Sequence, residues 1–453
     1  MSSNQSPDND VRRPLPSWLP SAIRNDRLWS HPDFVRLWTG RAVSQFGTQV
    51  SLVAIPLYAV LALDASALQM GILAAAAGIP RLLIGFIAGA WVDRLRRKPI
   101  MLVTDLCRAL TMATIPLAVA LGIESFALLV LVELLMGVFT VFFQASWAPY
   151  LPGLVGRGNL ASANSKMLAS NSVAQVAGPS LAGALVGALG APITLALDAA
   201  SYVWSALCIG KIRHVESPPE PIREERNLLR EIRQGLSVLV TSPMLRALTG
   251  SHATIIMAGN LFLAVYPLYM VDVLGLSARG VGLIYAAGGV GGLLGSLVTT
   301  WTIRRIGTGP TIVWSAVLFG VFGLTIPMAV LAPDYALPLV IFAEFAQWMT
   351  LVMFQITEGS LRLAVTPDRL LGRVAASDQV LSNGLQPAGA FVGGVLGELI
   401  GVQGALLVGV AGMFCAGAWV WWSPVREIAA MPTAPDPTLE EHGDFQIQGT
   451  PAS

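Results

Sequence analysis

The stretch Gly89-Ala-Trp-Val-Asp-Arg-Leu-Arg-Arg-Lys98 interrupts a sequence that is strongly apolar on both sides. Its last six residues bring together four cations and one aspartate. Charged side chains are costly to place in hydrocarbon, so residues of this kind lie in water or pair with one another. The stretch therefore marks a point at which the chain leaves a lipid bilayer.

The composition is that of a chain mostly embedded in lipid. Of its 453 residues, 54% are hydrophobic and only 12% are charged, whereas roughly a quarter are charged in a typical soluble domain. The 28 cations nearly cancel the 27 anions, which argues against a nucleic-acid partner. The sequence thus predicts a polytopic membrane protein in contact with the lipid bilayer.

Twelve apolar stretches are long enough to cross a bilayer as helices. We therefore expect an all-α membrane protein with twelve transmembrane helices. The expected spans are residues 34–63, 67–92, 99–122, 126–147, 161–189, 192–212, 245–274, 278–303, 310–331, 335–360, 374–400 and 404–422.

Arginine and lysine are distributed unevenly between the two sets of connections. The terminal segments and every second connection hold nearly all of them, whereas the opposite connections hold one, Arg279. By the positive-inside rule, both termini are expected in the cytoplasm, with the protein in a bacterial inner (plasma) membrane. The expected parts are a cytoplasmic segment (1–33), a six-helix bundle (34–212), a linker with an amphipathic helix (213–244), a second bundle (245–424) and a disordered cytoplasmic tail (425–453).

The two halves repeat each other at a shift of 211 residues. This shift places Pro56-Leu57-Tyr58 on Pro267-Leu268-Tyr269 and Glu133 on Glu344. A duplication of an even number of spans gives both copies the same orientation in the membrane. We therefore expect two parallel six-helix bundles, with a binding site between them near the middle of the bilayer.

The pattern Gly-x-x-x-Asp-Arg-x-x-Arg-Lys after the second span resembles the signature loop of the major facilitator superfamily of transporters. The resemblance implies a gating role for Gly89, Asp93, Arg94, Arg97 and Lys98. In that family the aspartate lies against the cytoplasmic N-terminus of span 11, and the arginines add ion pairs between the halves. One departure is Arg96, which stands where the family often has glycine.

Other segments resemble the twelve-span branch of this superfamily that contains enterobactin exporters and macrolide efflux proteins. They are residues 31–40, 89–108, 198–202 and 371–374. Span 5 contains Gly178-Pro179-Ser180-Leu181-Ala182-Gly183, which resembles a motif of proton-coupled exporters. Ala174 and Ser165 replace the glycines usual upstream. The alternative is that Gly178, Pro179 and Gly183 serve only close helix packing.

Glu133 and Glu344 are the intramembrane carboxyl groups with the strongest functional signal. Each lies about nine residues from the outer end of its span, or roughly 13 Å deep at 1.5 Å per residue. Charged groups at this depth line cavities, pair or relay protons. We therefore expect Glu344 and Glu133 to couple proton movement to transport, unless a nearby cation such as Arg41 or Arg108 makes Glu133 a structural partner.

Polar and aromatic side chains also follow helical spacing on spans 1, 4, 7 and 10, which surround the cavity in the family. The predicted cavity residues are Arg41, Gln45, Gln49, Gln144, His252, Asn260, Tyr266, Gln347, Trp348 and Gln355. Each has an alternative, because a lone histidine or glutamine often only bonds across helices. Asp105 and Arg108 are three residues apart and are expected to form a structural ion pair with each other or with Arg81.

Three functions are compatible with these features. The first is a proton-coupled exporter of a small amphipathic drug, antibiotic or siderophore, acting by alternating access, with protons and the small molecule as partners and a monomer as the working unit. The second is an importer or uniporter, and the third is a ligand sensor with a transporter fold. No phosphate-binding loop or clustered metal ligands occur in the sequence, so neither enzyme activity, nor a metal, nor a cofactor is expected.

Overall fold

The structure is a computed structural model that describes residues 28–216, 237 and 239–432. Within these residues the chain forms twelve long α-helices and no β-strand, which confirms the predicted all-α membrane fold. The first six are α2 (Pro32–Leu63), α3 (Ala67–Val92), α4 (Arg97–Leu121), α5 (Phe126–Val155), α6 (Leu160–Leu189) and α7 (Ala191–Gly210). The second six are α9 (Pro243–Leu268), α10 (Ala278–Ile306), α11 (Thr308–Met328), α12 (Ala336–Val365), α13 (Asp368–Ile400) and α14 (Val402–Trp421).

Two predicted segments lie almost wholly outside the described residues. One is the amphipathic helix expected within the linker at 226–240, of which only residues 237, 239 and 240 are described. The other is the tail at 425–453, of which only residues 425–432 are described. In the described part, Pro424–Glu427 forms a short 3₁₀ helix after α14. The cytoplasmic segment predicted for residues 1–33 is described only from residue 28.

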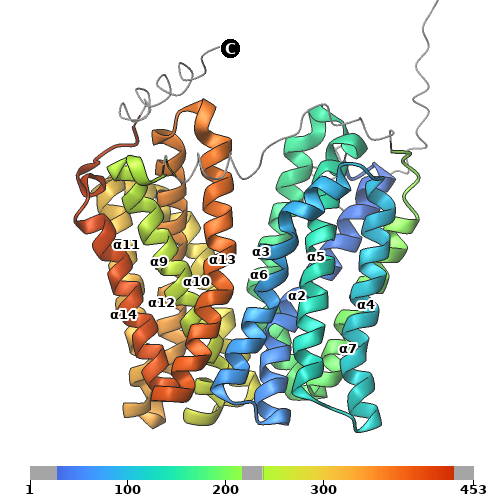
Figure 1. The fold of residues 1–453 in the computed structure, drawn as a ribbon, viewed down its shortest axis with the longest axis horizontal. Helices are drawn as coiled ribbons and strands as arrows, with labels where there is room; N and C mark the ends of the chain where they lie inside the picture. The colour runs from blue at the N-terminus through green and yellow to red at the C-terminus, as the bar shows by residue number, and fades with distance from the viewer. Residues whose placement is uncertain (1–27, 217–236, 238, 433–453) are drawn as a thin grey trace, which may run out of the picture.

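Eleven of the described helices are long and apolar enough to cross a membrane. The twelfth long helix, α13, does not meet this measure because it carries several charged and amide side chains, among them Asp378, Asn383 and Gln386. It nevertheless lies alongside the other helices of its bundle (Figure 1). A polar helix in this position must have its polar groups satisfied by the protein, since lipid offers no hydrogen bonds.

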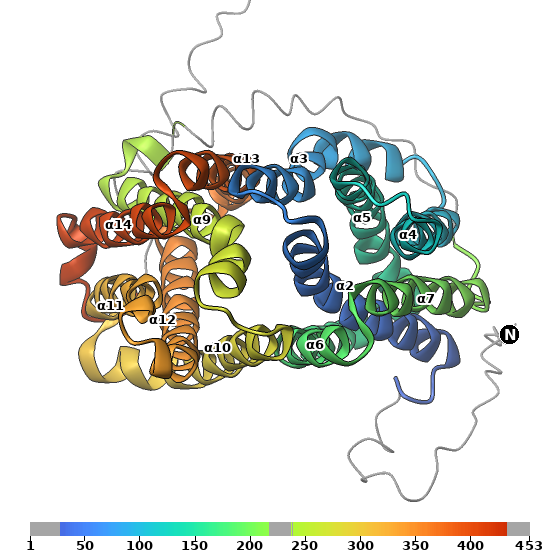
Figure 2. The ribbon, with the colours of Figure 1, turned by 90° about the horizontal axis from the view of Figure 1, so that it is seen from below.

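The helices form two bundles that stand side by side (Figure 2). In the first bundle α7 packs against α2 and α4, and α3 packs against α5. In the second bundle α12 packs against α10 and α11, and α9 packs against α14. Because each bundle has an even number of spans, α2 begins and α14 ends on the same side, which we call the termini side (top in Figure 1).

Corresponding helices of the two repeats begin with the same local signal. Ser66 caps α3 by accepting a hydrogen bond from the amide of Gln69, whose side chain accepts in turn from the amide of Ser66. Ser277 caps α10 by accepting from the amide of Gly280. Such caps satisfy amides at the first turn of a helix that have no partner within it. Both caps lie on the side opposite the termini, which we call the far side.

Two helix pairs, α3 with α13 and α6 with α10, hold the bundles together near the far side. A Cβ atom built on Gly71 of α3 would lie only 2.6 Å from the Cα atom of Gly394 in α13. A Cβ atom on Gly183 of α6 would lie 2.4 Å from the Cα atom of Gly282 in α10. Backbones can approach this closely only where both side chains are absent, as in many membrane helix pairs. We call these two contacts the glycine seams.

The α3–α13 contact ends before the helices reach the termini side. Arg81 donates a hydrogen bond of 3.2 Å from Nη1 to Oε1 of Gln386. Beyond this point a Cβ atom on Gly85 or Gly89 of α3, or on Gly372 of α13, would meet no atom within 4 Å. Figure 1 shows α3 and α13 diverging toward the termini side. The bundles are therefore joined at the far side and separated at the other.

The observed helices extend beyond several predicted spans. The fourth span was expected to end at residue 147, but α5 continues through Pro149 and Pro152 to Val155. The eleventh was expected to begin at residue 374, but α13 begins at Asp368. The apolar pattern marks only the part of a helix that hydrocarbon tolerates, whereas helical hydrogen bonding continues into the polar surroundings.

We predict that Gly71→Val loosens the α3–α13 seam. Overpacking of this kind costs about 1–3 kcal/mol, so the population with separated far-side ends should rise. Double electron–electron resonance between spin labels at the exposed residues Leu61 and Leu399 measures this separation. Gly85→Val is the matched control, because its side chain would enter open space. Identical distance distributions in the two variants would contradict the role of the seam.

Candidate binding cavity

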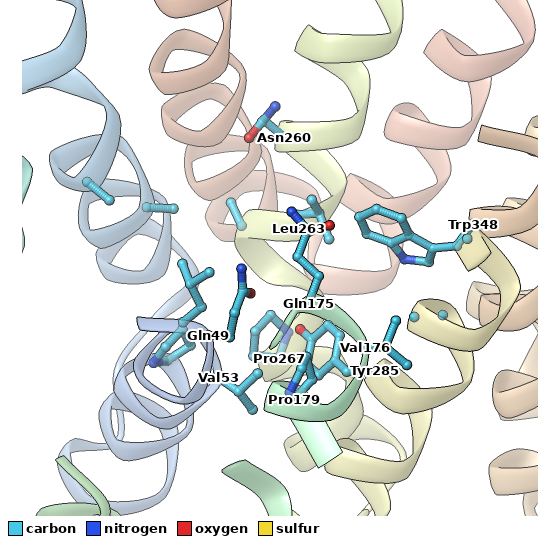
Figure 3. Close-up of a pocket in the computed structure, with 18 of the residues that line it drawn as sticks. Gln49, Val53, Gln175, Val176, Pro179, Asn260, Leu263, Pro267, Tyr285 and Trp348 are labelled. Atoms are coloured by element: carbon cyan, nitrogen blue, oxygen red, sulfur yellow. The ribbon is translucent and has the colours of Figure 1, made fainter. Parts of the chain in front are cut away.

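A cavity of about 710 Å³ lies between the two bundles (Figure 3). Its walls come from α2, α3, α5 and α6 of the first bundle and from α9, α10, α12 and α13 of the second. Apolar residues such as Met70, Leu263 and Tyr285 make up most of its lining. Its polar residues are Gln49, Glu133, Ser172, Gln175, Asn260, Ser296, Gln355 and Gln386. A mostly apolar pocket with a few polar groups suits a small amphipathic molecule.

The lining follows the internal repeat. At the 211-residue shift, Gln49 corresponds to Asn260 and Gln175 corresponds to Gln386, and all four line the cavity. Pro56 and Pro267 correspond in the same way, and both contribute to the wall. Gln175 and Gln386 were not among the predicted cavity residues, although the same shift that paired the two glutamates pairs them as well. The repeat was thus a usable signal for residues on spans 5 and 11.

Four predicted cavity residues line this cavity: Gln49, Asn260, Trp348 and Gln355. The other six predicted residues, Arg41, Gln45, Gln144, His252, Tyr266 and Gln347, are not part of its lining.

Several of those six side chains contact other residues of their own bundle instead of the cavity. The guanidinium of Arg41 stacks on the Trp147 ring at 3.5 Å, and Gln144 accepts a hydrogen bond of 2.6 Å from the same indole. Gln347 is buried, with Nε2 3.6 Å from Sδ of Met413. Gln45 is partly buried on α2. Helical spacing predicted that these residues share one face of each helix with the cavity residues. The part of that face that lines the cavity is narrower than the face itself.

Glu133 and Glu344 have different surroundings although they correspond in the repeat. Glu133 lines the cavity on α5, and no hydrogen bond joins its side chain to another described residue. Glu344 of α12 is 1% exposed. Its carboxylate accepts a hydrogen bond of 2.9 Å from Tyr266 Oη and one of 2.8 Å from Trp348 Nε1. Since Trp348 lines the cavity, its indole separates Glu344 from the cavity interior.

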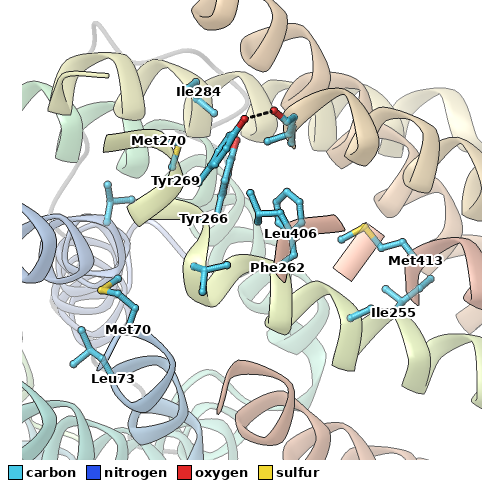
Figure 4. Close-up of a cluster of buried hydrophobic side chains, with 14 of the residues drawn as sticks. Met70, Leu73, Ile255, Phe262, Tyr266, Tyr269, Met270, Ile284, Leu406 and Met413 are labelled. Carbon is cyan, nitrogen blue, oxygen red and sulfur yellow. Dashed lines mark hydrogen bonds between the residues drawn. The ribbon is translucent and has the colours of Figure 1, made fainter. Parts of the chain in front are cut away.

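Aromatic and sulfur-containing side chains pack behind this part of the second bundle. Phe262 and Tyr266 are buried on α9, and Tyr269 is buried directly after the end of this helix (Figure 4). Met413 of α14 belongs to the same hydrophobic cluster. The Tyr266 and Tyr285 rings are 6.0 Å apart between centroids. This packing fixes Tyr266 as a donor to Glu344 and leaves the carboxylate little freedom to move.

Asp105 and Arg108 of the first bundle are buried and form the ion pair that was predicted for them. Arg108 Nη2 donates to Asp105 Oδ1, which confirms that these residues pair with each other. The Arg108 guanidinium also lies 4.2 Å from the centroid of the Phe143 ring. Neither Arg108 nor Arg41 forms an ion pair with Glu133 among the described residues. Both arginines that could have paired with Glu133 therefore contact other residues, Arg108 pairing with Asp105 and Arg41 stacking on Trp147.

Asp198 is a further buried carboxylate of the first bundle. It accepts hydrogen bonds from Ser51 and Ser201, the latter at 3.0 Å. A Cβ atom on Gly47 of α2 would overlap its Oδ1 atom, at 2.0 Å. The carboxylate therefore packs directly against the backbone of α2, where it ties α7 to α2.

The motif in α6 lies at close helix contacts. A Cβ atom on Gly178 would lie 2.4 Å from Cβ of Gln49, a cavity residue of α2. Pro179 lines the cavity, and Gly183 belongs to the α6–α10 glycine seam. This segment thus joins the cavity wall to the contact between bundles.

The signature loop does not bridge the two bundles in this structure. Asp93 caps the end of α3, and its Oδ1 lies 4.0 Å from Nη2 of Arg97 in its own bundle. Arg97 also lies 3.6 Å from Glu216 Oε1, and Lys98 Nζ donates to the carbonyl of Ile212 at 2.6 Å. The expected contact of Asp93 with the start of α13 is absent among the described pairs, because α3 and α13 have diverged at this level.

Two similar bundles of six helices around a central cavity define a membrane transporter with the major facilitator fold. Residues 29–448 match the family of transmembrane secretion effectors. The chain is 28% identical over 388 residues to the multidrug efflux pump Tap of Mycolicibacterium fortuitum, covering 81% of this chain and 92% of Tap. It is 26% identical over 404 residues to the enterobactin exporter EntS of Escherichia coli O1:K1, covering 88% of this chain and 91% of EntS.

Among solved structures, the chain resembles a bacterial homologue of the iron transporter ferroportin. The TM-score is 0.68 at 17% sequence identity, covering 86% of this chain and 98% of that one. The chain belongs to the transmembrane secretion effector family of the major facilitator superfamily, as the sequence motifs indicated. It is accordingly a multi-pass membrane transporter for small molecules and not an enzyme.

We predict that Asp93→Asn slows the transport of every compound by a similar factor, because the loop lies away from the cavity. The resemblance implies that Asp93 contacts the N-terminus of span 11 during the cycle, where a carboxylate contributes about 0.3–1 kcal/mol, which corresponds to roughly a two- to fivefold change in rate. Initial rates for several compounds test this, with Asp334→Asn at an exposed site as the control. A loss confined to one compound would show that Asp93 takes part in substrate selection.

Proposed function

We propose that this protein is a proton-coupled exporter of small amphipathic compounds that works by alternating access. The observation that carries the proposal is the cavity between the two repeats, which has a carboxyl group of each repeat in or directly behind its wall. The efflux activities in the names of its relatives support export as the direction. Import, uniport and ligand sensing remain the alternatives that the experiment below separates.

The orientation proposed for the chain has the termini side in the cytoplasm of a bacterial inner membrane. The termini side carries Arg94, Arg157, Arg304 and Arg369, whereas Arg279 is the cation of the far-side connections. This asymmetry supports the assignment by the positive-inside rule. The bundles are then joined at the outer side and separated at the inner side, as expected for an inward-facing state of a monomeric transporter.

Glu133 and Glu344 are proposed to carry the protons. Glu133 faces the cavity, so a proton or a cationic compound can reach it. Glu344 lies behind the indole of Trp348 and is held by Tyr266. A compound that displaces Trp348 would change the hydrogen bonding of Glu344, which links compound binding to proton release. The cavity itself favours flat or macrocyclic compounds, because its wall combines apolar and amide side chains.

The decisive experiment for this function is accumulation of a panel of antibiotics, dyes and siderophores in efflux-deficient cells. Cells that express the protein should hold less of at least one compound than cells with an empty vector. Collapse of the proton gradient should abolish the difference. Higher accumulation in expressing cells would identify an importer, an unchanged difference after collapse would exclude coupling to the gradient, and binding without any flux would identify a sensor.

We predict that replacing both carboxyl groups, Glu133→Gln and Glu344→Gln, removes gradient-driven export. Glutamine keeps the size and part of the hydrogen bonding but does not titrate. The double variant should therefore still bind the compound while accumulation rises to the level of cells without the protein. Glu427→Gln, at an exposed position after α14, is the matched control. Proton-coupled export that persists in the double variant would falsify the assignment.

We also predict that Trp348→Ala weakens the binding of several unrelated compounds. An aromatic contact contributes about 0.5–1.5 kcal/mol beyond its buried area, so dissociation constants should rise roughly two- to tenfold. Equilibrium binding to purified protein measures this, with Trp314→Ala on an exposed face of α11 as the control. If the purified protein binds one small, highly polar solute and nothing else, the proposed substrate class is wrong.

A further inference from the structure

Four ionisable side chains form a cluster in the second bundle, on the termini side of the cavity. They are His252 on α9, Glu358 and Arg362 on α12, and Asp378 on α13. Arg362 donates to both carboxylates, with Nε 3.0 Å from Glu358 Oε1 and Nη1 2.5 Å from Asp378 Oδ2. His252 lies eight residues before the cavity residue Asn260, or about 12 Å along the helix. The cavity site described above does not include this cluster.

The Nδ1 atom of His252 lies between a donor and an acceptor. It is 3.2 Å from Arg362 Nη2 and also 3.2 Å from Asp378 Oδ1. A ring nitrogen without a proton accepts from Arg362 and has nothing to donate to Asp378, whereas a protonated nitrogen donates to Asp378 and cannot accept. Only one of the two hydrogen bonds therefore exists at a time. Protonation of this atom exchanges a partner on α12 for a partner on α13.

With both carboxyl groups ionised, the charges of the cluster balance when His252 carries a proton. Glu358 and Asp378 supply two negative charges and Arg362 supplies one positive charge. With neutral imidazole the cluster retains one uncompensated negative charge in a place where unpaired charge is costly. Protonated imidazole removes that charge.

The first bundle has a permanent cation at the position that corresponds to His252. At the 211-residue shift, Arg41 stands where the second repeat has His252. Arg41 and Arg108 both stack on the Phe143 ring, at 6.0 and 4.2 Å. Asp105 is the buried carboxylate that pairs with Arg108 in this bundle. Histidine thus stands in the second bundle where the first has a cation whose charge does not change.

Besides Asp378, α13 carries Arg369 and Arg373 nine and five residues before it, and the charged groups of α3, α2 and the short helix after α14 form no ion pair with His252 among the described residues. The α14 helix carries no charged side chain along Val402–Trp421. Arg81 of α3 binds Gln386, and Arg41 of α2 stacks on Trp147. Arg426, in the short helix after α14, lies 3.5 Å from Glu427. The side chains of His252 and Asp378 are 20% and 17% exposed, so a proton can reach them from water.

We propose that His252 is a further proton-binding residue of the transport cycle, whose protonation exchanges its hydrogen bond to Arg362 for one to Asp378. Because α13 also forms the glycine seam with α3, this exchange links proton binding to the helix that joins the two bundles. The inference rests on the proposed proton-coupled function for its role in transport. The exchange of partners itself stands on the geometry of the cluster.

The proton-binding step is tested by nuclear magnetic resonance of the full chain in lipid nanodiscs with ¹⁵N-labelled histidine. The chain has four histidines, and His252→Gln identifies the signal of interest by its disappearance. Spectra are recorded between about pH 5 and 8, and the expected result is that Nδ1 of His252 changes from an acceptor to a donor within this range. A ring that stays neutral or stays charged over this whole range would overturn the proposal.

The conformational step is tested by electron resonance distances between spin labels at Leu168 and Ile306. These are exposed residues toward the termini-side ends of α6 and α10, labelled after replacement of the three native cysteines. The distance distribution should change with pH at the same midpoint as the His252 signal. His252→Arg supplies a fixed cation and should remove the part of the pH response that has the midpoint of the His252 signal, whereas any response of Glu133 and Glu344 should remain. His214→Gln, at a histidine against the Tyr150 ring, should leave the pH dependence unchanged.

A pH response that persists in His252→Arg with the midpoint of the His252 signal unchanged would overturn the proposal. Transport rates separate this inference from the proposed function. If export needs the gradient but keeps its pH profile in His252→Arg, then His252 is not a proton-binding residue of the cycle while the function stands. If protonation of His252 changes the distance between the helices but export does not depend on the proton gradient, the proposed function is wrong. The exchange of hydrogen-bond partners at His252 then still stands.

Discussion

The structure depends on the cost of leaving a charge unpaired inside a membrane-spanning bundle. Both repeats place ionisable side chains within their bundles, and both pair several of them with a partner on the same helix or on a neighbouring one. In the first bundle the cations are arginines, such as Arg108 against Asp105, which keep their charge under all conditions. In the second bundle the corresponding position holds His252 beside Asp378 and Arg362. At this pair of corresponding positions, the first bundle has a cation of fixed charge, whereas the second has a side chain that can gain or lose a proton.

The glycine seams decide where such a change can act. Gly71 against Gly394 and Gly183 against Gly282 hold the bundles in backbone contact near the far side. These contacts need no specific side chains, so a small rotation about them changes the separation at the termini side without breaking an ion pair. The α13 helix takes part in a seam, in the cavity wall through Gln386 and in the charge cluster through Asp378. Its polarity, unusual for a spanning helix, follows from these contacts.

Much of the architecture could be predicted from the sequence, because apolar length, cation asymmetry and the 211-residue repeat are properties of the chain itself. The pairing of Asp105 with Arg108 was also predictable, since residues three apart on a helix are neighbours.

The cavity was predicted less completely. Helical spacing fixes the direction in which a side chain points only approximately. Gln347 was therefore expected in the cavity, but it lies in the bundle interior beside Met413. The partners of His252 come from two other helices, and no pattern within α9 reveals them. The signature loop showed another limit, because the bridge to α13 that the resemblance implies for Asp93 is absent among the described contacts, where Asp93 lies near Arg97 of its own bundle.

The central claim is that proton movement and compound movement are coupled in opposite directions across one protein. It is tested most directly with purified protein in liposomes that contain a pH gradient and no other energy source. The account predicts that the compound moves against the direction of proton flow, accumulates above its equilibrium level and reverses direction when the gradient is inverted. A flux that only dissipates the compound's own gradient, at the same rate for either sign of the pH gradient, would contradict it.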